Sequence, residues 1–512
     1  MTAPSLLFWI HRAYKTVQRN YKKTLESRKR IVYNEIGRQV PEGTGALHFI
    51  TERKRGLSMS YGALNTKMRE MQDEIIASIQ QNMRIESVKG EPQPEAPYGA
   101  GPKAALEDLL ELGRKLGFKT GHADNRVGWV EYGEGEEMVG VLGHVDVVPA
   151  GEGWKYPAFG AEIHDGVLWG RGCLDDKGPT VGAIYALKAI RDLNLPIDRR
   201  IRVLFGSDEE CGSSCAKYYV ENGYELPVIG FTPDAEFPAI FCEKGISNFT
   251  CGAPVLRKGN IDVVSLEGGT ASNVVMPSCR LVVNGDIQVA ETEGITVTKK
   301  DGQTIVEAQG VSAHGSTPHL GVNAGIRLLE AVKENDFGGE FQELMDFILD
   351  KIGTETNGEK LGVYYADEET GETTVNLGIV SYDKEKLSFT LDVRYPKNAS
   401  AKVVDDTIVN AVNSYTLDVT KKSNLNLLYV PKDSELVTKL VRVYEAETGD
   451  KREPVAIGGG TYAKEFPNMV AFGPVFPGEP DVIHQPNECV EVEKLMRALE
   501  ITAAAMYELA KK

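Results

Sequence analysis

Short apolar runs alternate with polar clusters along much of the chain. Residues 139–142, 200–205 and 227–232 are largely apolar runs, and each is followed by residues that can carry chemistry. Such runs are typical of strands that are buried on both faces of a parallel sheet. Amphipathic helical patterns occur beside them, at residues 66–83 and 102–116. The succession of strand, acidic loop and helix predicts an α/β fold.

The pattern changes near Lys244. From about residue 245 to about residue 425, strands with alternating apolar and polar residues surround one predicted helix at 323–333, which is typical of an inserted α+β domain. The earlier pattern then returns, with helices predicted at 434–447 and 490–510. Because 512 residues exceed one ordinary hydrophobic core, two domains are expected. The predicted limits are residues 1–64 for an N-terminal extension, 65–245 and 426–512 for the two parts of the α/β domain, and 246–425 for the inserted domain.

Charge is unevenly distributed between the extension and the rest. Residues 1–58 contain 12 Lys+Arg and 4 Asp+Glu, a net charge of +8. Because the whole chain has a formal net charge of −17, the remaining residues have a net charge of −25. An acidic body argues against nucleic acid as a partner. The basic segment is either an interaction arm, a weakly ordered extension, or sequence translated upstream of the true start. The position of Met59, just before the first amphipathic helix, favours the last two.

Composition predicts a soluble cytoplasmic protein with no membrane partner. No apolar run approaches the length of a membrane span, and the run at residues 6–10 is too short for a signal peptide. The seven cysteines are scattered and odd in number, which favours free thiols in a reducing compartment.

Acidic residues follow the predicted strands at three places. Asp175 and its neighbour Asp176 lie in a glycine-flanked loop, and one carboxylate there could bridge two cations. Glu209 and Glu210 follow the next strand, where one could bind metal while the other acts as a general base. Asp234 follows a third strand. A solvated loop remains the alternative for each of these acids.

Two histidines stand in comparable positions. Apolar residues precede both His144 and His484, and Asp146 lies two places after His144, on the same face of the strand. A carboxylate so placed can hold the second ring nitrogen of a metal-binding histidine, although a structural pair is the alternative. Two histidines with several carboxylates fit a mixed nitrogen and oxygen dinuclear site.

Two residues of the inserted domain are further candidates. His314 lies among small residues before a predicted helix and could donate to a developing oxyanion. Arg394 ends an apolar strand and could bind a substrate carboxylate with two hydrogen bonds. The alternatives are a histidine at a helix start without chemistry and a salt-bridged surface arginine.

Seven motifs together resemble one enzyme family. In chain order they are GHVDVVP, GRGCLDDKGP, DEECG, TPDAEFP, AHGSTPHLGVNA, DVRYP and HQPNE. They are similar to those of the dinuclear zinc peptidases that include carnosinase, glutamate carboxypeptidase, succinyl-diaminopimelate desuccinylase and PepV-type dipeptidases. TPDAEFP and the large inserted domain resemble the PepV type most. The resemblance implies an α/β/α catalytic domain with an inserted α+β lid domain.

The resemblance also implies roles for individual residues. His144 and Asp234 would hold one metal ion, His484 and Glu210 the other, and Asp175 would bridge them. Glu209 matches the general acid and base, and Asp146 the carboxylate that orients His144. In the lid, His314 matches the histidine that stabilises the tetrahedral intermediate. The residues implied to contact substrate are Asn273, Arg394, Gly459 and Thr461.

The implied activity is hydrolysis of dipeptides, Xaa-His, β-alanyl or of broad specificity, by a metal-activated water. Two divalent ions per chain are implied, with zinc expected and manganese or cobalt as alternatives. The large lid replaces a dimer partner in PepV-type enzymes, so a monomer is expected. The alternatives are an N-acyl amino acid deacylase or desuccinylase on the same scaffold and a non-catalytic metal-binding protein.

Overall fold

The computed structural model describes residues 61–480 and 482–512. The expectations for the basic segment of residues 1–58 lie outside the described residues. No helix in the described part of the chain is long and apolar enough to cross a membrane.

The first sheet is formed by residues from both ends of the described chain. Its strand order is β1-β2-β6-β3-β7-β22-β9-β20, and β21 pairs with β9. The central strand β3 is parallel to β6 on one side and to β7 on the other, and all seven of its residues are buried. The strand bounds are Lys119–Ala123 (β1), Val127–Tyr132 (β2), Met138–His144 (β3), Arg200–Gly206 (β6), Ile229–Thr232 (β7), Ile240–Glu243 (β9), Leu428–Tyr429 (β20), Val455–Ile457 (β21) and Met469–Ala471 (β22).

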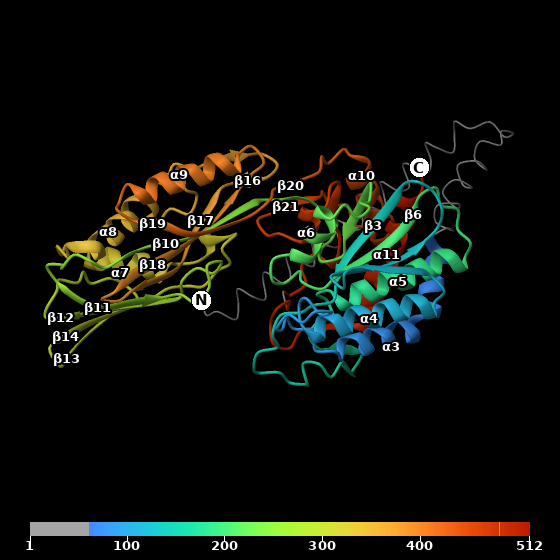
Figure 1. Cartoon of the computed structure of the whole chain (residues 1–512), viewed down its shortest axis with the longest axis horizontal. Coiled ribbons are helices and arrows are strands. Elements are labelled where there is room, and N and C mark those ends of the chain that lie inside the picture. Colours follow the sequence, from blue (N-terminus) through green and yellow to red (C-terminus); the bar gives the residue numbers. More distant parts are fainter. Residues whose placement is uncertain (1–60, 481) are drawn as a thin grey trace, which may run out of the picture. The chain divides into compact units, whose positions relative to one another are not determined.

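Helices pack against this sheet and against one another (Figure 1). Helix α5 contacts β3 and β6 and is itself covered by α3 and α11, which explains why its residues are buried on nearly every side. Helix α4 packs on β1 and β2. The helix bounds are Gln72–Met83 (α3), Ala100–Lys115 (α4), Lys177–Asp192 (α5), Ser214–Glu221 (α6), Glu435–Thr448 (α10) and Val492–Ala510 (α11), and residues 61–70 are also helical.

The second sheet is antiparallel and lies between β9 and β20 in the chain. Its order is β13-β14-β12-β11-β17-β18-β10-β19. The bounds are Gly245–Pro254 (β10), Asp262–Gly268 (β11), Ser278–Asn284 (β12), Ile295–Lys300 (β13), Gln303–Gln309 (β14), Thr374–Tyr382 (β17), Lys386–Tyr395 (β18) and Asp418–Leu425 (β19). Helices α7 (Ala324–Val332), α8 (Gly339–Phe347) and α9 (Ala401–Asn413) pack against it (Figure 1).

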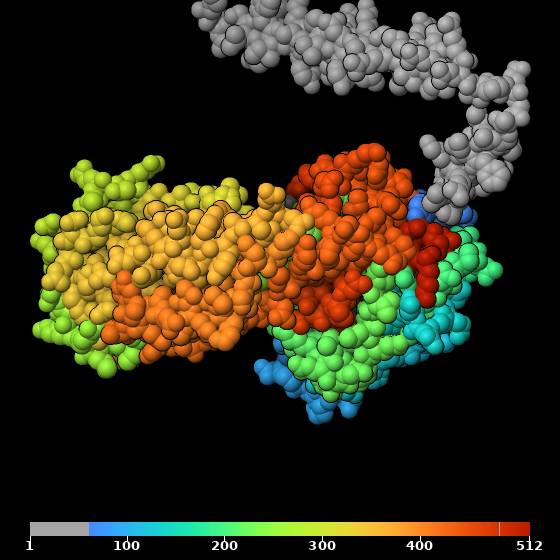
Figure 2. Space-filling model, turned by 90° about the horizontal axis from the view of Figure 1, so that it is seen from above, coloured from blue at the N-terminus to red at the C-terminus, as the bar shows by residue number. Residues whose placement is uncertain are grey.

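This second sheet has its own hydrophobic core. Phe249, Leu281, Phe347 and Phe389 are buried in it, together with side chains of α7 to α9. Residues of this part of the chain, yellow-green to orange in the space-filling view, form one continuous body (Figure 2). A mixed sheet with helices and an inserted antiparallel sheet with helices confirm the predicted fold class, while the residue limits given to the domains stay a prediction.

Short elements complete the fold. A three-stranded sheet joins β24 (Cys489–Glu491), β5 (Val167–Trp169) and β4 (Glu162–His164), and so brings the segment before α11 beside the strand that leads into the loop with Asp175. The remaining pieces are β8 (Ala235–Glu236), which pairs with β23 (Pro474–Val475), β15 (Ala366–Asp367), which pairs with β16 (Gly371–Glu372), and the short helices η1 (Pro318–Leu320), η2 (Ile348–Ile352) and η3 (Tyr462–Glu465).

Candidate metal centre

The candidate residues of the α/β part gather at the carboxyl ends of parallel strands. His144 is the last residue of β3, Glu209 follows β6, and Asp234 follows β7. Asp175 lies two residues before α5. Since β3, β6 and β7 are parallel neighbours, their ends meet at one edge of the sheet, which is where open α/β sheets place ligands.

Two imidazoles approach one carboxylate from different sides. Nε2 of His144 lies 2.9 Å from Oδ1 of Asp175 and 3.8 Å from Oδ2 of Asp234. Nε2 of His484 lies 2.9 Å from Oδ2 of Asp175 and 3.0 Å from Oε2 of Glu210. Asp175 therefore lies between two groups of potential ligands, one with His144 and Asp234 and one with His484 and Glu210.

The donor atoms are close enough to share an ion. Ligand atoms of His144, Glu209 and Asp234 all lie within 4.8 Å of one another, and so do those of His144, Asp175 and Glu210. Nε2 of His144 is fully buried, and among the described residues its close contact with Asp175 lacks the geometry of a hydrogen bond. A buried nitrogen without a hydrogen bond, facing carboxylate oxygens, is what a coordinated cation would satisfy. The residues present therefore fit a divalent metal.

Burial and mutual repulsion shift the pKa values of the acids in this site. Burial, together with the carboxylates of Glu210 and Asp146, raises the pKa of Glu209 to about 8. Burial and the charge of Asp175 raise the pKa of Asp234 well above its ordinary value. Burial alone would raise the pKa of Asp175, but the two neighbouring imidazoles hold it well below its usual range. Bound cations would stabilise the ionised carboxylates.

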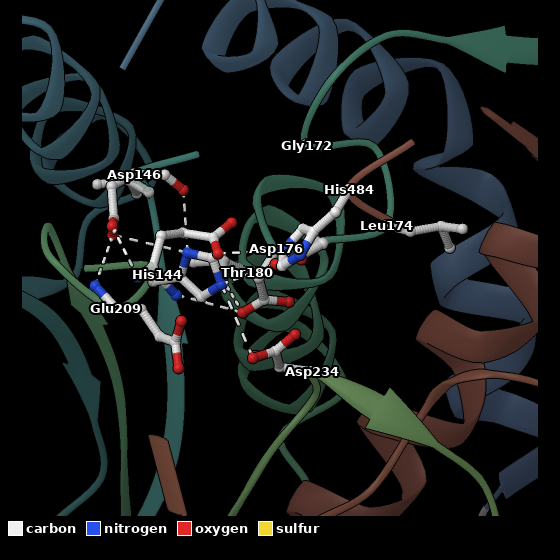
Figure 3. A network of polar contacts seen from close by, with 12 residues as sticks. His144, Asp146, Gly172, Leu174, Asp176, Thr180, Glu209, Asp234 and His484 are labelled. Atoms are coloured by element: carbon white, nitrogen blue, oxygen red, sulfur yellow. Dashed lines mark hydrogen bonds and ion pairs between the residues drawn. The ribbon is translucent and has the colours of Figure 1, made fainter. Parts of the chain in front are cut away.

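Asp146 makes more contacts than the sequence predicts. Nδ1 of His144 lies 3.0 Å from the backbone oxygen of Asp146 and 3.6 Å from its carboxylate oxygen Oδ1. The carboxylate instead accepts the backbone N–H groups of Glu209 (3.0 Å) and Glu210 (3.1 Å). Figure 3 shows Asp146 and Asp234 on opposite sides of the His144 ring. The backbone oxygen of Asp146 thus orients the ring of His144, and its carboxylate orients the acidic loop of Glu209 and Glu210.

Asp176 supports the same strand end. Its Oδ2 accepts the backbone N–H of His144 at 3.2 Å and the hydroxyl of Thr180 at 2.9 Å, and the residue is fully buried. The peptide bond between Asp175 and Asp176 is cis. Of the two neighbouring acids, Asp175 faces the imidazoles and Asp176 holds the backbone.

The lid candidates lie in two paired segments. Val274 and His314 form an antiparallel bridge, and the N–H of Gly315 donates to the backbone oxygen of Asn273 at 2.7 Å. Nδ1 of His314 lies 2.7 Å from the hydroxyl of Ser316. His314 therefore lies beside Asn273, and the clusters of ligand-type side chains found among the described residues do not include it.

Arg394 holds the glycine-rich loop of residues 458–460. Its guanidinium binds the carboxylate of Asp392 through two hydrogen bonds of 2.8 and 3.0 Å and donates to the backbone oxygen of Gly458 at 2.7 Å. A Cβ on Gly458 would lie 2.6 Å from Cβ of Ser316, so the loop can pass the His314 segment because residue 458 is glycine. The same loop continues into Gly459, which is half-buried, and Thr461.

Comparison with known proteins assigns the family. The model of peptidase family M20/M25/M40 matches residues 140–508. The chain belongs to this family. A Bacillus subtilis (strain 168) protein named "Putative dipeptidase YtjP" is 38% identical over 457 residues, covering 86% of this chain and 98% of that protein. A Staphylococcus haemolyticus (strain JCSC1435) protein named "Putative dipeptidase SH1171" is 34% identical over 462 residues, with the same two coverages.

A solved structure shows the same fold. Human carnosine dipeptidase 1 superimposes with a TM-score of 0.54 at 14% sequence identity, covering 88% of this chain and 99% of that chain. Membership of the M20/M25/M40 family confirms the resemblance inferred from the seven motifs and the enzyme class, a hydrolase that acts as a metallopeptidase. The clusters around Asp175 agree with a metal-dependent peptidase.

The sequence analysis did not single out several residues that support this candidate site. Glu243, at the end of β9, accepts the backbone N–H and the hydroxyl of Thr461 at 2.8 and 2.6 Å. Lys177 is buried, and its ammonium donates to the backbone oxygens of Asn82 and Ile85. Glu488 and Arg171 form a buried ion pair. All but Glu243 lie within or beside the seven motifs, and this position in a motif is the feature of the sequence that could have identified them.

Proposed function

We propose that the protein is a metal-dependent dipeptidase that hydrolyses the peptide bond of short substrates with a metal-activated water. The observation that carries the proposal is the pair of ligand groups that share Asp175, with Glu209 beside them. The names of the relatives at 38% and 34% identity support a dipeptide substrate.

The proposed centre holds two divalent ions, zinc in the first place and manganese or cobalt as alternatives. His144 and Asp234 would bind one ion, His484 and Glu210 the other, and Asp175 both. When bound, such ions lower the pKa of water and polarise a carbonyl oxygen. The mixture of imidazole nitrogens and carboxylate oxygens supports this assignment.

Glu209 is the proposed general base and acid. Its carboxylate lies within reach of the ligand atoms of His144 and Asp234, and its backbone is held by Asp146. It would take a proton from the attacking water and deliver that proton to the nitrogen of the leaving amine. Burial raises the pKa of Glu209 to about 8 in the metal-free protein, and bound cations would lower this pKa toward the range in which the carboxylate can both accept and return a proton.

The lid residues are proposed to bind the substrate. His314 would donate a hydrogen bond to the oxyanion, and Asn273, in the paired segment, would contact the substrate backbone. Arg394, Gly459 and Thr461 would bind the C-terminal carboxylate of the substrate. Three N–H groups of Arg394 are engaged by Asp392 and Gly458, which leaves two N–H groups for this carboxylate.

A monomer in the cytoplasm is the proposed state of the protein. All seven cysteines are free thiols, which supports a reducing compartment. The inserted domain is large enough to have its own hydrophobic core, which supports the proposal that a monomer supplies every catalytic group.

A substrate panel tests the function. Purified protein is freed of metal, reloaded with zinc, manganese or cobalt, and assayed with dipeptides, including Xaa-His and β-alanyl ones, and with N-acetyl and N-succinyl amino acids. Hydrolysis of dipeptides in preference to N-acyl amino acids is expected. Preference for the N-acyl compounds would assign a deacylase or desuccinylase instead. Binding of metal without hydrolysis of any compound would leave only a metal-binding protein.

A further inference from the structure

A buried ion pair joins the two loops that contain Asp175 and His484. Nη1 of Arg171 lies 2.8 Å from Oε2 of Glu488, and their side chains are 1% and 0% exposed. The second carboxylate oxygen, Oε1, accepts the backbone N–H groups of Gly172 and Leu174, each at 3.1 Å. Glu488 therefore binds the loop that leads directly into Asp175.

Arg171 extends the connection to two further stretches of backbone. Its guanidinium donates to the backbone oxygens of His484 and Gln485 at 3.4 Å, and to the backbone oxygen of Pro149 at the same distance. Pro149 follows the segment that contains Asp146. Figure 3 shows His484 beside the loop of Gly172 and Leu174. One ion pair thus contacts the segments of both imidazoles and of the carboxylate between them.

We propose that Arg171 and Glu488 are positioning residues, which hold Asp175 and His484 at the spacing that two cations require before the cations bind. The inference rests on the proposed metal centre. Without the pair, the mutual repulsion of the buried carboxylates would favour separation of the loops in the metal-free protein. Groups that orient ligands from behind typically change metal affinity by about 10- to 100-fold when they are removed.

A purely stabilising ion pair makes a different prediction. Burial of two charges costs much of what their attraction returns, so a buried pair is weak evidence for a role in stability. If stability were the only role, loss of the pair would lower the melting temperature and leave metal affinity unchanged. Metal affinity therefore separates the two explanations.

The experiment compares Glu488→Gln and Arg171→Lys with the wild type. Zinc affinity is measured by competition with a chromophoric chelator, and folding by circular dichroism and thermal unfolding. Glu488→Gln keeps the shape and one acceptor, so it mainly removes charge. We expect the dissociation constant of the more weakly bound ion to rise by about 10- to 100-fold in both variants.

Glu500→Gln is the matched control. Glu500 lies in α11, its side chain is buried, and it pairs with Arg69 and with Arg497 (2.7 Å to the latter), so it is also a buried carboxylate with arginine partners. Its replacement is expected to lower the melting temperature without a change in zinc affinity. Zinc affinity within threefold of the wild type in a folded Glu488→Gln or Arg171→Lys variant would overturn the proposal.

A measurement on the unaltered chain decides the case if both variants unfold. In the metal-free wild type, the backbone amides of Gly172 and Leu174 should exchange hydrogen slowly, because Glu488 accepts both. Exchange as fast as at Gly151, in an exposed loop, would contradict preorganisation. None of these readouts needs hydrolysis. If zinc binds as expected but no dipeptide is cleaved, the proposed function fails and the positioning role stands.

Discussion

The carboxylate of Asp146 accepts the backbone N–H of Glu209 at 3.0 Å. This hydrogen bond ties the end of β3 to the acidic loop that follows β6, across two neighbouring parallel strands. The orientation of Glu209, the proposed general base, therefore depends on Asp146. The sequence analysis predicts for the Asp146 side chain only a contact with His144.

Replacement of Asp146 by Asn should affect the base as well as the histidine. An amide nitrogen in place of one carboxylate oxygen would face the N–H of Glu209 or Glu210 and lose that hydrogen bond. We expect kcat to fall by about 10- to 100-fold, with bound metal at half or more of the wild-type content. Kinetics and elemental analysis of the same preparation measure both. Asp165→Asn, in an exposed turn, is the control, and equal kcat in the two variants would refute the role.

Replacement of Glu209 by Gln should separate catalysis from metal binding. The amide cannot accept the proton of water, so kcat is expected to fall by about 100- to 10,000-fold, the usual contribution of general base catalysis. Because other residues are the proposed ligands, metal content should stay unchanged. Glu152→Gln, in an exposed loop, controls for the loss of one negative charge. Turnover close to that of the wild type would rule out Glu209 as the base.

Metal affinity should increase with pH. The carboxylates of Asp175 and Glu210 raise the pKa of His484 to about 10 in the metal-free protein, so its imidazole is protonated at neutral pH. A metal ion can bind this imidazole only after the proton leaves, and a group with a raised pKa loses its proton as the pH rises. Affinity should therefore rise by about tenfold per pH unit for each proton released, up to about pH 10.

Proton release can be measured directly. Calorimetric titration of zinc into the metal-free protein, in two buffers of different ionisation enthalpy, gives the number of protons released. His122→Gln, on the exposed part of β1, should release as many as the wild type. Identical heats in both buffers would show that His484 is already neutral and that this explanation of its pKa is wrong.

The strands that contribute the site could be predicted because they are buried on both faces. β3 and β7 are buried throughout, so their sequences are continuous apolar runs that end directly before the candidate ligands. β10 was not predicted, since its Gly and Asn residues interrupt the alternation, nor was the edge strand β19, whose residues are mostly exposed and polar. Such strands are set by their partners in the sheet, which a local pattern does not contain.

Helix α9 has a clear helical pattern in its sequence, although the sequence analysis does not predict it. Val404, Ile408 and Val412 are buried at intervals of four residues, which is an ordinary helical signal. The ion pair of Arg171 and Glu488 is different, because 317 residues separate its members and each resembles a loop residue by itself. The spacing within a motif predicts neighbours along the chain, and only the folded backbone brings such distant charges together.

Replacement of Thr461 by Val tests the glycine-rich loop. The hydroxyl of Thr461 donates to Oε1 of Glu243 at 2.6 Å, and Glu243 is fully buried, so its loss leaves a buried carboxylate oxygen with one partner fewer. We expect the free energy of unfolding to fall by about 1–3 kcal/mol. Because this loop is proposed to bind the substrate carboxylate, KM should rise several-fold while kcat changes less. Thr420→Val, on the exposed edge strand β19, removes a hydroxyl far from this loop in the chain and should change neither KM nor kcat. A lower kcat with unchanged KM would instead assign the loop to the chemical step.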